Sequence, residues 1–190
     1  MIRIFFILAA ALTAAAPLRA QPWASERIGP FWYNPSFDEE TGRDRSYAYV
    51  RAALNGEPVE QRGGDGGDLI WTCGDSLLIY ISIPRVRAGD RGRMIYAFDQ
   101  DAPDTVNVPV SRMAAWELPP ERNRAFTARA RTARTLTVRL LNGRRRTDRV
   151  FEMDSAGRVL GRLACVRELE PLLPRTRGTW CWRTWKTRRC

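Results

Sequence analysis

Short apolar runs separated by turn residues recur through the middle of the chain, and this pattern predicts β-strands. Residues 69–73 and 77–83 are two such runs on either side of a Gly-Asp-Ser turn, which is typical of a β-hairpin. Residues 136–141 and 149–153 flank the Asn-Gly dipeptide at 142–143, which can take the positive φ angles of a tight turn. Further strands are expected over residues 47–54, 94–98 and 105–110.

Two segments depart from this β pattern and have helical spacing. Residues 122–133 predict a short helix with Phe126 and Ala130 on one face. Residues 159–164 carry apolar side chains at positions i, i+1, i+4 and i+5, as in a helix that buries one stripe. We therefore predict a mainly β, β-sandwich-like single domain with one or two short helices and a disulfide staple.

The N-terminus has the pattern of a secretory signal peptide. Arg3 supplies a positive charge, residues 4–16 are uncharged, and small residues precede an expected cleavage site after Ala20. The apolar run has 13 residues, whereas a membrane-spanning helix needs about 20. An uncleaved N-terminal anchor is the alternative. We predict an exported, periplasmic protein with no transmembrane segment in the mature chain.

Residues 1–20 are thus the expected signal peptide, and the mature chain divides into three parts. Residues 21–46 are expected to be irregular, with five aromatic side chains broken up by prolines. Those aromatics fit packing at an edge or lid better than a ligand cage. Residues 47–166 form the β-rich domain, and residues 167–190 form a basic tail rich in Trp, Arg and Cys.

All four cysteines lie in the mature chain: Cys73, Cys165, Cys181 and Cys190. An even number of cysteines in an exported chain indicates disulfides, and four cysteines allow three pairings. We favour Cys73–Cys165, because both residues end core-forming segments, together with Cys181–Cys190, because both lie in the polar tail. A metal site is not expected, since the chain has no His and no CxxC spacing.

The order of these features resembles a family of small periplasmic β-rich proteins, some of which are associated with type VI secretion. The features are an apolar strand ending in Cys73, the strand at 77–83, a strand ending in Tyr96-Ala97-Phe98-Asp99, a short helix with Phe126, the strands at 136–139 and 151–153, and a short helix closing on Cys165. The resemblance covers about residues 45–166. It implies a β-rich periplasmic domain with a Cys73–Cys165 bridge, and it supplies no catalytic residues. The N-terminal aromatic segment and the tail after Val166 depart from it.

Most catalytic arrangements are excluded by composition. Without His there is no Ser-His-Asp or Cys-His nucleophile, and the single lysine, Lys186, lies in the tail. Phosphate-binding and dinucleotide-binding glycine motifs are absent. The Gly- and Asp-rich residues 63–68 fit an ordinary loop better than a calcium site, since they lack EF-hand spacing. We expect no catalytic residues and no cofactor, and a hydrolase with a carboxylate pair remains an alternative.

Positive charge is unevenly distributed along the chain, which has 31 basic and 21 acidic residues. Residues 121–149 contain ten Arg against two acids. The candidate surface-binding residues are Arg144, Arg145, Arg146, Trp180, Trp182, Arg183, Trp185, Lys186, Arg188 and Arg189. Trp interspersed with cations favours a membrane interface, although a solvated arginine-rich surface would have the same composition.

These features predict a non-enzymatic accessory or binding protein of the cell envelope. Its expected partner is an envelope protein, an anionic lipid or an anionic polymer. Nucleic acid fits the charge but not the compartment. The first alternative is a binder of anionic membrane surfaces or polyanions that uses the arginine segments and the tail.

Overall fold

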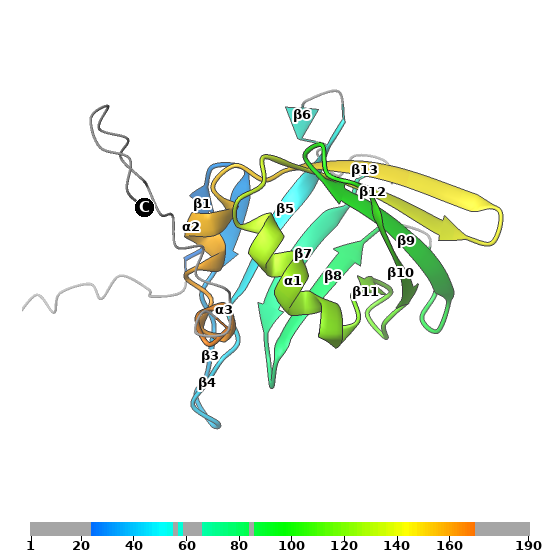
Figure 1. Ribbon diagram of the computed structural model, residues 1–190. Coiled ribbons are helices and arrows are strands. Elements are labelled where there is room, and N and C mark those ends of the chain that lie inside the picture. The colour runs from blue at the N-terminus through cyan, green and yellow to red at the C-terminus, as the bar shows by residue number, and fades with distance from the viewer. Residues whose placement is uncertain (1–23, 55–56, 59–65, 84–85, 170–190) are drawn as a thin grey trace, which may run out of the picture.

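The computed structural model describes residues 24–54, 57–58, 66–83 and 86–169. They form one long antiparallel sheet that folds over on itself, with the strand order β10-β9-β12-β13-β5-β7-β8-β11 (Figure 1). The strands are β5 (Tyr47–Leu54), β7 (Asp68–Cys73), β8 (Leu77–Ser82), β9 (Arg91–Phe98), β10 (Asp104–Pro109), β11 (Trp116–Glu117), β12 (Thr135–Asn142) and β13 (Arg145–Glu152). The mainly β, sandwich-like fold predicted from the apolar pattern is confirmed.

Strand β5 joins the two halves of the folded sheet. Its first half pairs with β7, whereas Ala52 and Ala53 near its end pair with β13. The two outermost strands also approach each other, because Val110, just after β10, forms a bridge with Trp116 of β11. The inner faces of both halves therefore enclose a single core.

The N-terminal segment differs from the irregular structure expected for residues 21–46. Residues 26–34 form a hairpin of β1 (Glu26–Ile28) and β2 (Phe31–Asn34), and β2 extends the sheet by pairing with β5. Phe31 and Tyr33 are buried in the core, with Trp32 between them on the outer side. A smaller hairpin, β3 (Phe37–Asp38) and β4 (Arg43–Asp44), follows, and a two-residue strand, β6 (Glu57–Pro58), pairs with the end of β5.

Among the described residues, three short helices pack on the side of the folded sheet away from the β12–β13 turn, which we call the helical end. They are α1 (Pro120–Ala130), α2 (Ala156–Leu160) and α3 (Ala164–Arg167). Helix α1 crosses in front of β7 and β8, and α2 and α3 lie beside it (Figure 1). The sequence predicted one continuous helical stripe over 159–164, but α2 ends at Leu160, with Gly161 as its C-cap, and α3 begins at Ala164. The apolar side chains of that stripe are nevertheless buried: Val159, Leu160 and Leu163 are fully inaccessible to solvent.

Helix α1 closes the helical end with an aromatic cluster. The Phe126 ring lies 5.0 Å from the Phe98 ring, 5.2 Å from Tyr96 and 6.2 Å from Trp71, measured between ring centroids. Phe98 and Tyr96 belong to β9 and Trp71 belongs to β7, so one helical side chain contacts both halves of the sheet. The Asn123 side-chain amide also donates a 2.7 Å hydrogen bond to the carbonyl of Leu77 at the start of β8.

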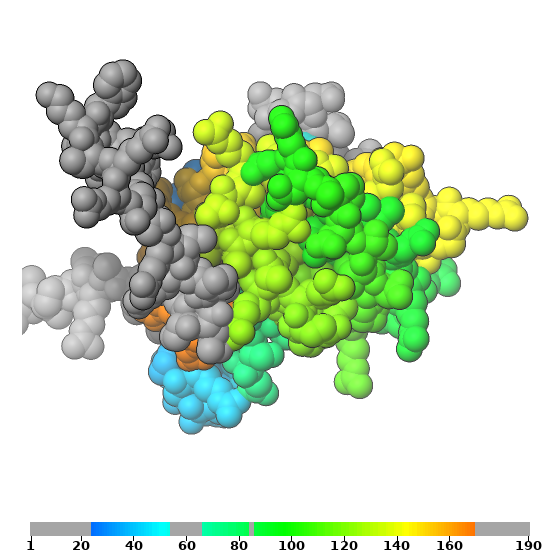
Figure 2. All heavy atoms as spheres, viewed as in Figure 1, coloured from blue at the N-terminus to red at the C-terminus, as the bar shows by residue number. Residues whose placement is uncertain are grey.

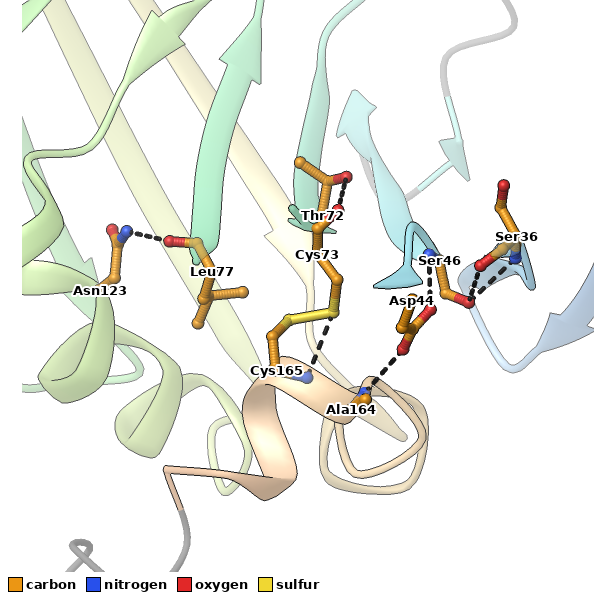
Figure 3. Close-up of a disulfide and its surroundings, with 9 residues drawn as sticks. All are labelled: Ser36, Asp44, Ser46, Thr72, Cys73, Leu77, Asn123, Ala164 and Cys165. Atoms are coloured by element: carbon orange, nitrogen blue, oxygen red, sulfur yellow. Dashed lines mark hydrogen bonds between the residues drawn. A yellow bond between two sulfur atoms is a disulfide. The ribbon is translucent and has the colours of Figure 1, made fainter. Parts of the chain in front are cut away.

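A disulfide between Cys73 and Cys165 fixes α3 to the end of β7 (Figure 3), as the sequence predicted. The two Cα atoms are 5.6 Å apart. The backbone N–H of Cys165 donates to the sulfur of Cys73, and that of Ala164 donates to the carboxylate of Asp44. The second predicted pair, Cys181–Cys190, lies outside the described residues. In the part of the chain that the structure describes, no helix is long and apolar enough to cross a membrane.

Candidate functional site

The β12–β13 hairpin projects from the end of the sheet opposite the helices (Figures 1 and 2). The two strands pair along their full length, from Thr135–Glu152 to Asn142–Arg145. Gly143 in the turn has a φ of 57°. This is the left-handed conformation that the Asn-Gly dipeptide was expected to allow. Arg144, Arg145 and Arg146 follow directly and are exposed at the tip.

Strand pairing brings further arginines beside this tip. Leu141 of β12 lies between Arg146 of β13 and Arg93 of β9, so these two arginines lie on the same outer face. Both Arg93 and Arg91 are exposed at the start of β9. We call this region the arginine end, and define it by Arg91, Arg93, Arg139, Arg144, Arg145 and Arg146.

One carboxylate neutralises part of this charge. Asp148 accepts hydrogen bonds from Arg139 Nε at 2.8 Å and from Arg146 Nε and Nη2 at 2.9 and 2.6 Å. The bonds from Arg146, and then those from Arg139, lower the pKa of Asp148 below its usual value, and the same pairing raises the pKa of Arg146. Asp148 therefore stays ionised, and it holds two arginines flat against the outer face of the hairpin.

The inner face of the same hairpin changes from apolar to polar toward its tip. Leu136, Val138 and Leu140 of β12 are buried in the core. Thr147 lies opposite Leu140, and Arg145 lies opposite Asn142 two residue pairs further out; side-chain alternation places both on this inner face. The core thus ends in polar side chains at the arginine end.

A cavity of about 330 Å³ lies at this transition. Ile83, Val86, Trp116 and Leu140 form its apolar lining. Its polar lining consists of Asn142, Arg145, Arg146 and Thr147. The cavity therefore has aliphatic and aromatic walls on one side and hydrogen-bond donors on the other.

A second, wider cavity of about 830 Å³ lies at the helical end beside the disulfide. Half-exposed Phe37, together with Leu77 and Leu169, lines it, along with charged residues of both signs. Two of those charges, Arg43 and Asp75, form an ion pair. Figure 3 shows the disulfide and Asp44 at this end of the domain.

Among the described residues, Asp38, Asp99 and Asp148 have shifted pKa values, and all three values are lowered. The cause is hydrogen bonding, from Thr41 to Asp38, from the backbone of Thr135 and Arg134 to Asp99, and from Arg146 to Asp148. A general acid in glycoside hydrolysis needs a raised pKa instead. Among the described residues, no group of three or more His, Cys, Asp or Glu side chains is placed to hold a metal ion.

The sequence-predicted site residues are only partly brought together. Arg144, Arg145 and Arg146 meet at the arginine end, where charge counting had placed them. Arg91 and Arg93 were missed, because their strand is distant in sequence and only pairing of β9 with β12 brings them near. The predicted tail residues lie outside the described residues: Trp180, Trp182, Arg183, Trp185, Lys186, Arg188 and Arg189.

Neither a protein-family model nor a curated protein sequence matches this chain. Among solved structures, it is similar to the crystal structure of invasion associated protein B from Bartonella henselae, with a TM-score of 0.48 and 8% sequence identity. The similarity covers 76% of this chain and 99% of that chain. At this TM-score it supports no conclusion about function. The resemblance to proteins associated with type VI secretion therefore stays a prediction.

Proposed function

We propose that the protein is an exported, non-catalytic binding protein of the cell envelope, and that its arginine end contacts an anionic membrane surface. The observation that carries this proposal is the concentration of six arginines at the projecting end of one sheet. The N-terminal signal pattern and the Cys73–Cys165 disulfide support export, since disulfides persist in oxidising compartments.

The charge balance of this end favours binding to phosphate groups. Its six arginines are opposed by Asp148 and by Asp90 at the start of β9, which leaves a net charge of +4. A guanidinium matches phosphate with paired N–H donors. Each cation near an anionic leaflet contributes about 1 kcal/mol, so four give about 4 kcal/mol at low salt. That is sufficient for measurable attachment to vesicles.

We expect the mature chain from Gln21 to co-sediment with vesicles containing phosphatidylglycerol at low salt, and to be released as salt is raised. The triple variant Arg91→Glu, Arg93→Glu, Arg144→Glu should lose at least tenfold in binding. A matched control, Arg122→Glu, Arg158→Glu, Arg167→Glu, reverses the same number of exposed charges on the helices. It should bind much more strongly than the first variant.

Two outcomes would contradict this assignment. Equal losses in both triple variants would show that net charge alone matters, as for a solvated arginine-rich surface. Vesicle binding by a chain that ends at Pro174 tests the predicted contact by the Trp- and Arg-rich tail. Loss of binding in that chain, with full binding by the arginine-end variant, would transfer the site to the tail.

Removing the carboxylate that holds Arg139 and Arg146 should strengthen vesicle binding. Asp148→Asn adds one positive charge to the arginine end and frees both guanidinium groups. We expect binding about fivefold tighter at low salt, from about 1 kcal/mol for one more cation near the surface. Asp75→Asn makes the same charge change at the helical end, and it should leave binding nearly unchanged. Co-sedimentation of the two variants at matched salt provides the test, and equal gains would argue against the arginine end.

A further inference from the structure

We propose that the cavity at the arginine end binds one aliphatic chain that carries a single anionic head group. The chain would lie against Ile83, Val86, Trp116 and Leu140, and the head group would contact Arg145 and Thr147. This site shares Arg145 and Arg146 with the arginine end of the proposed membrane contact, but it takes a monomeric ligand and not a surface.

The two ends of the folded sheet differ in how the core is closed. At the helical end, Phe126 of α1 fills the space between β7 and β9. At the arginine end, the described chain places no helix, and the core ends at the cavity of about 330 Å³. This volume lies at the lower end of the range of small-molecule sites, about 300–1,000 Å³. It suits a single hydrocarbon chain of moderate length.

The apolar wall is built from residues that are already held rigidly. Leu140 is 3% exposed, Ile83 is 6% exposed and Trp116 is 2% exposed. Trp116 is also fixed by its neighbours, since its ring packs so closely on Gly92 that a Cβ there would come within 2.6 Å of it. The wall therefore needs little rearrangement to receive a chain, which reduces the entropic cost of binding.

The polar side of the cavity fits an anion. A guanidinium has five N–H donors, so Arg145 can bind a carboxylate or phosphate while keeping another contact. Thr147 adds a hydroxyl beside it. The amide of Asn142 is already directed to Asp90, to which it donates a 3.2 Å hydrogen bond, and the backbone N–H of Arg87 donates to the same carboxylate oxygen. Asp90 is the charge that opposes an anion here; it bonds to Asn142 but is not among the residues that line the cavity.

Inward-facing charge on a strand has another known role, which is to protect an unpaired edge from joining another sheet. Among the described residues, β13 pairs with β5 only at Val150 and Phe151, so its first half is an edge. Edge protection explains the inward-facing charge of Arg145 and no other feature of the cavity. It does not explain an apolar cavity opposite Arg145 and Thr147, and it predicts no ligand.

The test uses decanoate and decyl phosphate below their micelle concentrations, and uncharged decanol below its solubility limit, in calorimetric titrations of the mature chain. We expect one equivalent of decanoate or decyl phosphate to bind, and decanol to bind at least tenfold more weakly. The relative affinities of the two anions identify the preferred head group. Across octanoate, decanoate and dodecanoate, affinity should rise by up to about fourfold for each added methylene until the cavity is full.

Two variants place the site. Arg145→Met keeps the length of the side chain without its charge, and Thr147→Phe fills the cavity; each should weaken decanoate binding at least tenfold. Arg144→Met, a neighbouring exposed arginine outside the cavity lining, is the control and should bind as the parent does. Circular dichroism and melting temperature establish that each variant is folded. A photoreactive decanoate should also label the peptide containing Trp116 in the unmodified chain, which requires no variant.

Decanoate binding that survives both cavity variants, labelling elsewhere, or no binding at millimolar decanoate would overturn the proposal. The vesicle result is independent of it. The Arg91, Arg93 and Arg144 triple variant should lose vesicle binding and still bind decanoate. In the unmodified chain, vesicle binding without decanoate binding would reject the cavity site and leave the membrane contact intact.

Discussion

Replacing Phe126 with Ala should lower the free energy of unfolding by about 3–5 kcal/mol. The side chain is 1% exposed, and it packs against aromatic rings from β7 and β9 at once. Its removal leaves a cavity where α1 closes the helical end, and it also breaks edge-to-face ring contacts, which add about 0.5–1.5 kcal/mol beyond burial. Ala favours helix formation, so the loss would come from packing and not from helix propensity.

Urea denaturation followed by circular dichroism measures this loss. Phe126→Leu should recover part of the stability, because it keeps an apolar side chain in the space. Arg122→Ala, at an exposed position on the same helix, should change stability by no more than about 0.5 kcal/mol. A loss below about 1 kcal/mol for Phe126→Ala would mean that α1 does not close the core in solution.

The two hairpins that local sequence signals predicted have short connections. Asn142 ends β12 and pairs with Arg145, so Gly143, with its positive φ, and Arg144 form the turn of the β12–β13 hairpin, and the Gly-Asp-Ser segment connects β7 to β8. The β1–β2 hairpin was missed because each of its strands is very short. Prolines interrupt that segment, and its order comes from pairing of β2 with β5 and from burial of Phe31.

Counting the charges along the sequence identified only part of the arginine end. The run Arg144–Arg146 was visible in the sequence, but Arg145 and Arg146 stand on opposite faces of β13, and this follows from strand alternation. The cavity depends on still more distant relations, since its walls come from β11, β12 and β13 and from Ile83 and Val86, which follow β8. To predict such a site, one must know the register of strands that are not neighbours in the sequence, and one sequence does not provide it.

The features that stabilise the domain and those proposed to bind ligands lie at different ends of the sheet. The helical end holds the disulfide, the aromatic cluster and all three helices. The arginine end holds the exposed cations and the smaller cavity. Substitutions at one end should therefore have little direct effect at the other, because energetic coupling between distant sites without shared partners is small.

Replacing Cys73 and Cys165 together with Ala should lower the free energy of unfolding by about 4 kcal/mol. The disulfide joins residues 92 positions apart, and in the chain-entropy model a loop of this length contributes about 4–5 kcal/mol by restricting the unfolded chain. The buried residues Leu163 and Val166 around α3 do not depend on the bond for their packing, so the variant should still fold. Denaturant unfolding of the parent, the double variant and the reduced parent provides the measurement.

The double variant also tests the separation of the two ends. Because the disulfide lies at the helical end, vesicle and decanoate binding should persist at temperatures where the variant is folded. Non-reducing peptide mapping of the parent should join the Cys73 and Cys165 peptides, with neither joined to Cys181 or Cys190. A stability loss below about 1 kcal/mol, or binding that disappears while circular dichroism remains native, would show that the disulfide has a different role from the one its position indicates.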